Sequence, residues 1–185
     1  MKTDDFNVHD RIDGTLFENN IHFLTGELEQ ENVDNAIKWI VSENLDTKNQ
    51  KTLTLYINST GGDLYNAFAL IDVMRNSHRP ICTIAIGSAM SAAFLILAAG
   101  TKGQRYVARN TGLMCHQYSD EAAGKHHDLK AHMREGNLCH DRMLQILRES
   151  TSLPATKIKS KLLTATDNFL TAEEILQLGI VDHIL

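Results

Sequence analysis

The chain has 185 residues, 43% of them hydrophobic, and a net charge of −5. This length is enough for one domain with a substantial core, taken here as residues 1–185, and the acidic balance argues against a nucleic-acid partner. The polar, acidic start predicts no secretory signal, and the apolar stretch 81–99 is interrupted by Gly87 and Ser88, so it predicts a strand and a helix rather than a membrane span.

Strands and helices alternate along the chain. The apolar period of residues 31–45 predicts an amphipathic helix. The predicted elements that follow are strand 53–57, helix 63–76, strand 81–86 and helix 91–99. Such repeats are typical of an α/β fold with parallel strands joined by right-handed crossovers.

Ser91 lies at the junction between the last two of these elements. A serine at the start of a helix is close to free N–H groups and to the positive end of the helix dipole, which favour a developing negative charge. This predicts a nucleophile, although Ala93 stands where the Gly-x-Ser-x-Gly motif needs its second glycine. A helix cap without catalytic function is the alternative, because serine is a common N-cap.

A second strand-to-helix junction, residues 58–63, carries two adjacent glycines. An exposed amide there, together with the amide of Ala92, would form an oxyanion hole, whereas a simple tight turn is the alternative. His116 is expected at the end of a short apolar strand, where its side chain projects into a cleft. Asp167 is expected just before a helix that begins with a capping box over residues 171–174. Taken singly, these two residues also fit a core histidine and a turn aspartate.

The order Ser91, His116, Asp167, with the Asn-Ser-x-Gly-Gly loop upstream, resembles the proteolytic subunit of the Clp protease. Further matching segments are 21–26, 55–59, 97–105, 114–117, 167–174 and 179–182. The likeness runs from about Leu16 to the end of the chain.

The resemblance implies a role for each candidate residue. Ser91 is then the nucleophile, His116 the general base and Asp167 the orienting carboxylate of a serine endopeptidase. The backbone amides of Gly62 and Ala92 are the oxyanion donors. Asp182, in the closing strand segment, is the less favoured alternative to Asp167.

The resemblance also implies an architecture and an assembly. The fold is expected to be α/β, with Clp/crotonase-like strand–helix units and a protruding handle helix at about residues 120–150. The subunits form a homo-oligomer of heptameric rings stacked in pairs, a tetradecamer that hydrolyses peptides and unfolded proteins in its chamber. An AAA+ unfoldase partner delivers folded substrates and alone uses ATP, so no cofactor or metal is expected in this chain. The expected location is the cytoplasm, with no membrane partner.

Three departures from the family pattern stand out. Residues 118–120 (Tyr-Ser-Asp) replace the usual proline and glycine-rich turn, and residues 165–166 (Ala-Thr) replace an acidic–arginine pair that contacts the opposite ring. The aromatic docking pocket for the unfoldase keeps Tyr56, but Thr54 and Asn76 stand where an aromatic residue is common. We therefore expect a ring–ring contact that depends less on salt bridges.

Several alternatives remain open from the sequence. A catalytically silent Clp-type scaffold subunit, a crotonase-like acyl-CoA enzyme and an α/β binding module are the other functions considered. The histidines and Cys139 of segment 126–140 have spacings unlike a metal site and predict a solvated surface. Gly136 predicts a bend or a close approach in the handle. Cys115, beside His116, is expected in the core, and all three cysteines are expected to be reduced thiols.

Overall fold

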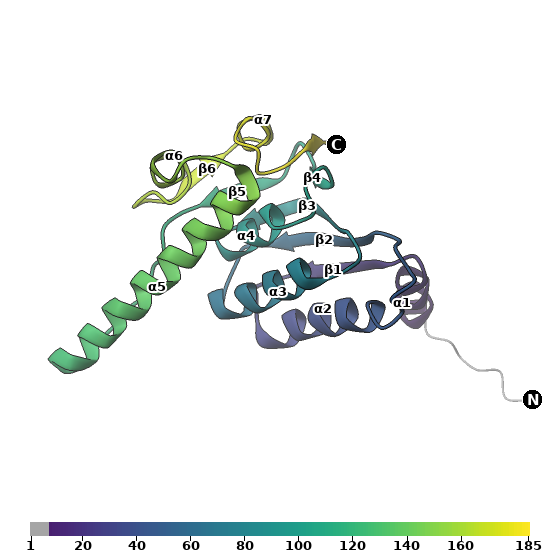
Figure 1. The fold of residues 1–185 in the computed structure, drawn as a ribbon, viewed down its shortest axis with the longest axis horizontal. Coiled ribbons are helices and arrows are strands. Elements are labelled where there is room, and N and C mark those ends of the chain that lie inside the picture. The colour runs from purple at the N-terminus through teal and green to yellow at the C-terminus, as the bar shows by residue number, and fades with distance from the viewer. Residues whose placement is uncertain (1–7) are drawn as a thin grey trace, which may run out of the picture.

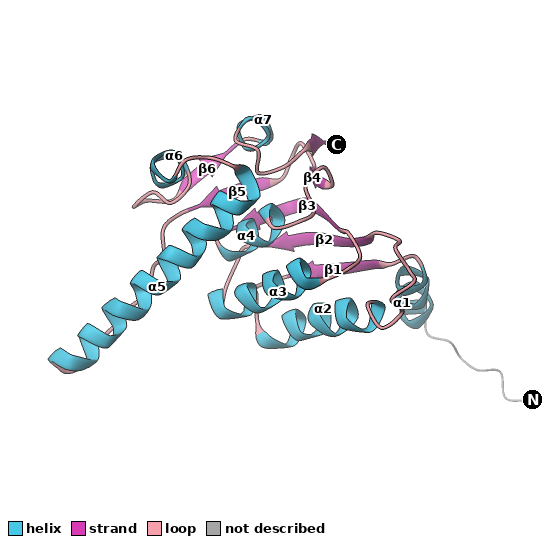
Figure 2. Cartoon of the chain, in the orientation of Figure 1, coloured by secondary structure: helices cyan, strands magenta, loops and turns pink. Residues whose placement is uncertain are grey.

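A computed structural model describes residues 8–185 and shows helices packed on one mixed sheet (Figures 1 and 2). The strands are β1 (Ile21–Thr25), β2 (Leu53–Ser59), β3 (Ile81–Met90), β4 (Arg105–Val107), β5 (Gly112–Cys115), β6 (Asn168–Leu170) and β7 (His183–Ile184). The helices are α1 (Val8–Glu18), α2 (Gln30–Glu43), α3 (Leu64–Asn76), α4 (Ala92–Ala98), α5 (His126–Thr151), α6 (Ala155–Lys161) and α7 (Ala172–Gln177). The predicted α/β class with a protruding helix is confirmed. The chain's start, where the sequence predicts no secretory signal, lies outside the described residues.

The sheet is parallel along its main path, in the order β1-β2-β3-β4-β7. The long strand β3 has two different neighbours on one side, because its first half pairs with β4 and its last three residues pair with β5. β5 in turn pairs with β6 in the antiparallel direction. The carboxyl end of β3 is therefore the place where the parallel sheet meets a small antiparallel ribbon.

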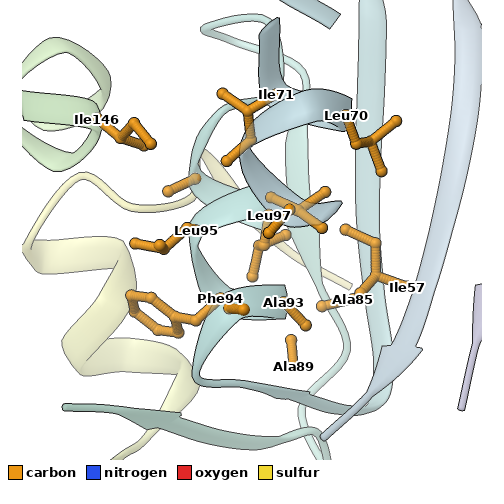
Figure 3. Packing of buried hydrophobic residues seen from close by; sticks show 14 of the residues in the cluster. Ile57, Leu70, Ile71, Ala85, Ala89, Ala93, Phe94, Leu95, Leu97 and Ile146 are labelled. Carbon is orange, nitrogen blue, oxygen red and sulfur yellow. The ribbon is translucent and has the colours of Figure 1, made fainter. Parts of the chain in front are cut away.

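Helix α4 lies at the centre of the core. All seven of its residues are buried, and Phe94, Leu95 and Leu97 are fully enclosed. Figure 3 shows these side chains among residues of β2, β3, α3 and α5. Since burying one such side chain contributes about 1.5–3 kcal/mol, α4 and the turn that precedes it are held firmly in place.

Helix α5 is the expected handle and extends well beyond the sheet (Figure 1). It begins at His126, so the predicted helical stretch 120–150 is wrong at its start, where residues 120–125 form a loop. Strand β3 runs to Met90 rather than ending at residue 86, because Gly87 and Ser88 form an irregularity within the strand instead of a turn. No helix within residues 8–185 has the length and apolar character needed to cross a membrane.

Candidate active site

Ser91 occupies a strained turn between β3 and α4. Its backbone has φ 51° and ψ −121°, a left-handed region that costs a residue with a side chain about 1–3 kcal/mol. Its N–H donates to the carbonyl oxygen of Met114 at 2.9 Å, which ties the turn to β5. The hydroxyl does not cap α4. Instead, Ser91 Oγ lies 2.8 Å from His116 Nε2, within hydrogen-bond distance.

The pairing of β3 with β5 explains this distance. Met90 pairs with Met114, so Ser91 follows the end of one strand while His116 follows the end of its neighbour. Cys115 points the other way and is fully buried, as expected for adjacent residues on a strand. Burial raises the pKa of the Cys115 thiol to about 12, so this sulfur stays protonated and offers no competing nucleophile.

The glycine-rich loop lies directly against the Ser91 turn. Gly61 has φ 99°, and a Cβ added to it would lie 2.8 Å from the Met90 carbonyl oxygen and 2.8 Å from Ser91 Cβ. Gly62 has φ 142°, and its added Cβ would lie 2.7 Å from the backbone nitrogen of Leu28. Both positions therefore require glycine, for conformation and for space.

Hydrogen bonds from both sides hold this loop. The Gly61 N–H donates to Ser59 Oγ at 3.1 Å, and the Leu28 N–H donates to the Gly61 carbonyl oxygen at 2.7 Å. Next to them, Asn58 Oδ1 accepts from the Ser88 backbone N–H at 3.1 Å and from the Ser88 hydroxyl at 3.2 Å. The glycine loop and the last residues of β3 thus form one connected unit.

Asp167 enters from the antiparallel ribbon. The last pair of that ribbon joins Cys115 to Asn168, so the register places His116 opposite Asp167. Within residues 8–185 the Asp167 carboxylate makes no hydrogen bond or ion pair, and the residue is exposed. The structure brings Asp167 to the histidine without joining the two.

One cleft of about 450 Å³ contains the residues that the sequence favours for this site. Gly62, Ser91, Ala92, His116 and Asp167 all line it. The sequence did not predict the apolar part of its lining, which comes from Leu64, Met114 and Met143. Met143 reaches the cleft because of the way α5 docks, which no local sequence pattern shows.

Asp182, the alternative to Asp167, lies elsewhere. Its carboxylate accepts hydrogen bonds from Arg105 at 2.7 and 2.9 Å and from the Gly103 N–H at 2.7 Å. Burial raises the pKa of Asp182, but the hydrogen bonds and charge of Arg105 outweigh burial, so this pKa lies below its usual value. Arg105 pairs with Thr83 at the start of β3, whereas Ser91 follows the end of that strand. Asp182 is therefore at the wrong end of β3 to contact His116.

A family model described as Clp protease matches residues 5–185. The chain belongs to the Clp protease family. This membership supports a protease role. In the part of the chain from residue 8 onward, the His, Cys, Asp and Glu side chains form no group of three or more that would hold a metal ion.

Proposed function

We propose that the chain is a serine endopeptidase in which Ser91 is the nucleophile, His116 the general base and Asp167 the orienting carboxylate. The observation that carries the proposal is the 2.8 Å contact between Ser91 Oγ and His116 Nε2 at a strained strand-to-helix turn. A nucleophile within hydrogen-bond distance of its base, with a carboxylate opposite that base, is the arrangement used for acyl transfer.

The chemistry follows from this arrangement. Ser91 Oγ attacks a peptide carbonyl carbon as its proton passes to His116 Nε2. The amides of Gly62 and Ala92 donate to the oxyanion of the tetrahedral intermediate. His116 then returns the proton to the leaving amine, which gives an acyl-enzyme on Ser91, and water hydrolyses this ester by the same sequence. Asp167 holds the imidazole in the tautomer that accepts the serine proton.

The chemical assignment is tested by labelling and hydrolysis. A fluorophosphonate probe is expected to label the native chain and Ser88→Ala, and both are expected to hydrolyse peptides. Ser91→Ala is expected to lose both properties while keeping its fold, because the covalent path has no nucleophile. Substantial hydrolysis by Ser91→Ala would reject the assignment, and a native chain that neither reacts nor hydrolyses would favour a silent scaffold subunit.

Proteins of this family generally form oligomers and work with unfoldases. We propose heptameric rings stacked in pairs through α5, enclosing the sites. The support is the apolar surface that α5 exposes at Leu129, Met133 and Leu138, since an exposed apolar patch usually marks an interface.

An AAA+ unfoldase is the proposed partner. The proposed docking point is the pair of stacked aromatic side chains of Phe23 and Tyr56, whose centroids are 4.8 Å apart. We place this assembly in the cytoplasm, where the buried free thiols would stay reduced.

Light scattering at low and high salt tests the assembly. We expect ring-sized particles at both salt concentrations, because residues 165–166 supply no charged pair at the proposed ring–ring contact. A stable monomer at micromolar concentration would reject the rings. Dissociation of the double ring into single rings on modest addition of salt would contradict the claim that the ring–ring contact does not depend on salt bridges.

A further inference from the structure

Tyr118 lies between two clefts of this molecule. The cleft of Ser91 and His116 has a neighbour of about 840 Å³ that runs along α5 and is lined by Leu129, His132 and Met133 among others. Residues 117–119 line both clefts. Of these three residues, Tyr118 is the one that packs against the hydrophobic core, whereas Gln117 and Ser119 are exposed. Tyr118 therefore lines both spaces, and its ring is the inward-packed part of the wall that they share.

The ring of Tyr118 is seated in a notch of the helix. A Cβ added at Gly136 would lie 3.1 Å from Tyr118 Cε1 and 3.3 Å from Cδ1, so the ring lies against bare backbone at that position. This is the close approach that the glycine in the handle predicted from sequence. Larger residues at position 136 would push the ring away from α5.

Two hydrogen bonds hold the segment that carries the ring. The phenol donates to Asp120 Oδ2 at 2.9 Å, and the Gln117 N–H donates to the Thr164 carbonyl oxygen at 3.0 Å. Burial, followed by the bond to Asp120, raises the pKa of Tyr118 to about 12, so the phenol remains a donor at neutral and mildly alkaline pH. The wall is thus anchored at its tip and at its base.

We infer that Tyr118 sets the upper size limit of the substrate side chain that fits beside Ser91. The inference rests on the proposed peptidase function. The residue whose carbonyl Ser91 attacks must place its side chain within a few ångströms of Ser91, in the cleft that Tyr118 closes. The apolar lining from Leu64, Met114 and Met143 selects apolar side chains, and the ring stops the cleft from continuing into its larger neighbour along α5. Tyr118 is a specificity residue here and takes no part in proton transfer.

The test uses full-length chain and four peptide coumarin amides that differ only in the residue before the cleaved bond: Ala, Leu, Phe or Trp. Tyr118→Ala joins the two clefts, so we expect its kcat/KM ratio of Trp to Leu to rise at least tenfold over the native ratio, in line with what a pocket change of this size produces. Tyr118→Phe keeps the ring and loses only the bond to Asp120, and we expect the native ratio. Tyr118→Leu is expected between the two.

The possible results distinguish a failure of the Tyr118 size limit from a failure of the proposed peptidase function. Particle size and circular dichroism first establish that each variant is assembled and folded. An equal fall of kcat/KM for all four peptides in Tyr118→Ala, or an unchanged ratio, would overturn the inference and leave the peptidase assignment standing. A native chain that cleaves none of the four and is not labelled at Ser91 would overturn both.

Discussion

The turn that holds Ser91 and the loop that holds Asp167 line the same cleft, but the rest of the chain holds them very differently. Ser91 is followed by a helix whose seven residues are all buried, and the glycine loop packs on it with no spare space. Asp167 is exposed, makes no hydrogen bond within residues 8–185, and precedes a strand of three residues.

This difference indicates which contacts fix the position of Ser91 and which fix the position of Asp167. Ser91 and the amides of Gly62 and Ala92, the proposed nucleophile and oxyanion donors, are placed by the chain's own core, which can maintain a strained backbone because so much packing surrounds it. The Asp167 carboxylate is placed by the register of a short ribbon and by two hydrogen bonds beside it, from the Gln117 N–H to the Thr164 carbonyl oxygen at 3.0 Å and from Asn168 Nδ2 to the Lys161 carbonyl oxygen at 2.7 Å. Within residues 8–185 the carboxylate makes no hydrogen bond, so its position beside His116 depends on the backbone that carries it.

The largest change in catalytic rate that would test this comparison of the Ser91 turn with the Asp167 loop is expected on substitution of Asp167. Asp167→Asn should lower kcat by about 10⁴ if the carboxylate controls the tautomer of His116, while the melting temperature stays nearly unchanged because the residue is exposed. Peptide hydrolysis and thermal unfolding measure the two quantities. Glu173→Gln, an exposed carboxylate of α7, serves as the control and should keep the native rate. Normal hydrolysis by Asp167→Asn would remove Asp167 from the mechanism.

The next largest effect is expected in the glycine loop that packs against the Ser91 turn. Gly61→Ala should lower kcat by about 10²–10³, the usual cost of losing an oxyanion donor, because the new methyl group would collide with the Met90 carbonyl and displace the loop. Gly103→Ala is a matched control, since Gly103 also has a positive φ, of 86°, but has open space around its Cβ. We expect both variants to lose stability and only Gly61→Ala to lose hydrolysis. Equal hydrolysis by the two variants would contradict a close-packed loop.

A third, smaller effect is expected far from the cleft. Asp182→Asn should destabilise the folded chain by about 1.5–3 kcal/mol at pH 7, the range for hydrogen bonds to charged groups. The folded pKa of Asp182 is lowered, so its contribution is complete above the unfolded pKa and is lost as the pH falls through the folded pKa. Urea unfolding of both chains between pH 7 and pH 3 should show the difference shrinking in acid. A difference that stays constant with pH would mean that the charge of Asp182 contributes nothing.

The smallest effect tests the contact between α5 and the segment after His116. Gly136→Ala gains helix propensity of up to about 1 kcal/mol relative to glycine but crowds the Tyr118 ring. We expect little net change in the native chain and stabilisation approaching the full gain in a Tyr118→Ala background, measured as a double-mutant cycle by thermal unfolding. Identical changes in the two backgrounds would show that ring and notch do not interact.

Local patterns predicted best those features whose signals lie within a few residues of one another. The strand and the helix on either side of Ser91 can be predicted from the sequence because each is a short run of mostly apolar residues that are buried. The capping box at the start of α7 is also confirmed, with Thr171 Oγ1 accepting from the Glu174 N–H at 3.2 Å and the Glu174 carboxylate accepting from the Thr171 N–H at 2.8 Å. Such patterns depend only on neighbours in sequence.

What the sequence did not predict depends on distant partners. Strand β3 continues past Gly87 because Asn58, some thirty residues earlier, accepts from the backbone of Ser88. Helix α1 has no buried residue, and the sequence did not predict it. The approach of Asp167 to His116 follows from pairing between two very short strands, which no local pattern encodes.

The buried guanidinium of Arg105 also joins two helices at their ends. It donates to the carbonyl oxygens of Ala98 at 3.3 Å and of Ser150 at 3.0 Å, so the last turns of α4 and α5 are bound to one group. Helix α5 has 26 residues and is about 39 Å long, and its buried residues all lie between Cys139 and Ser150. Its first half therefore extends beyond the core, while its second half and the end of α4 share one buried cation. Ser91 precedes the opposite end of α4 from Ala98, so this shared attachment lies away from the cleft.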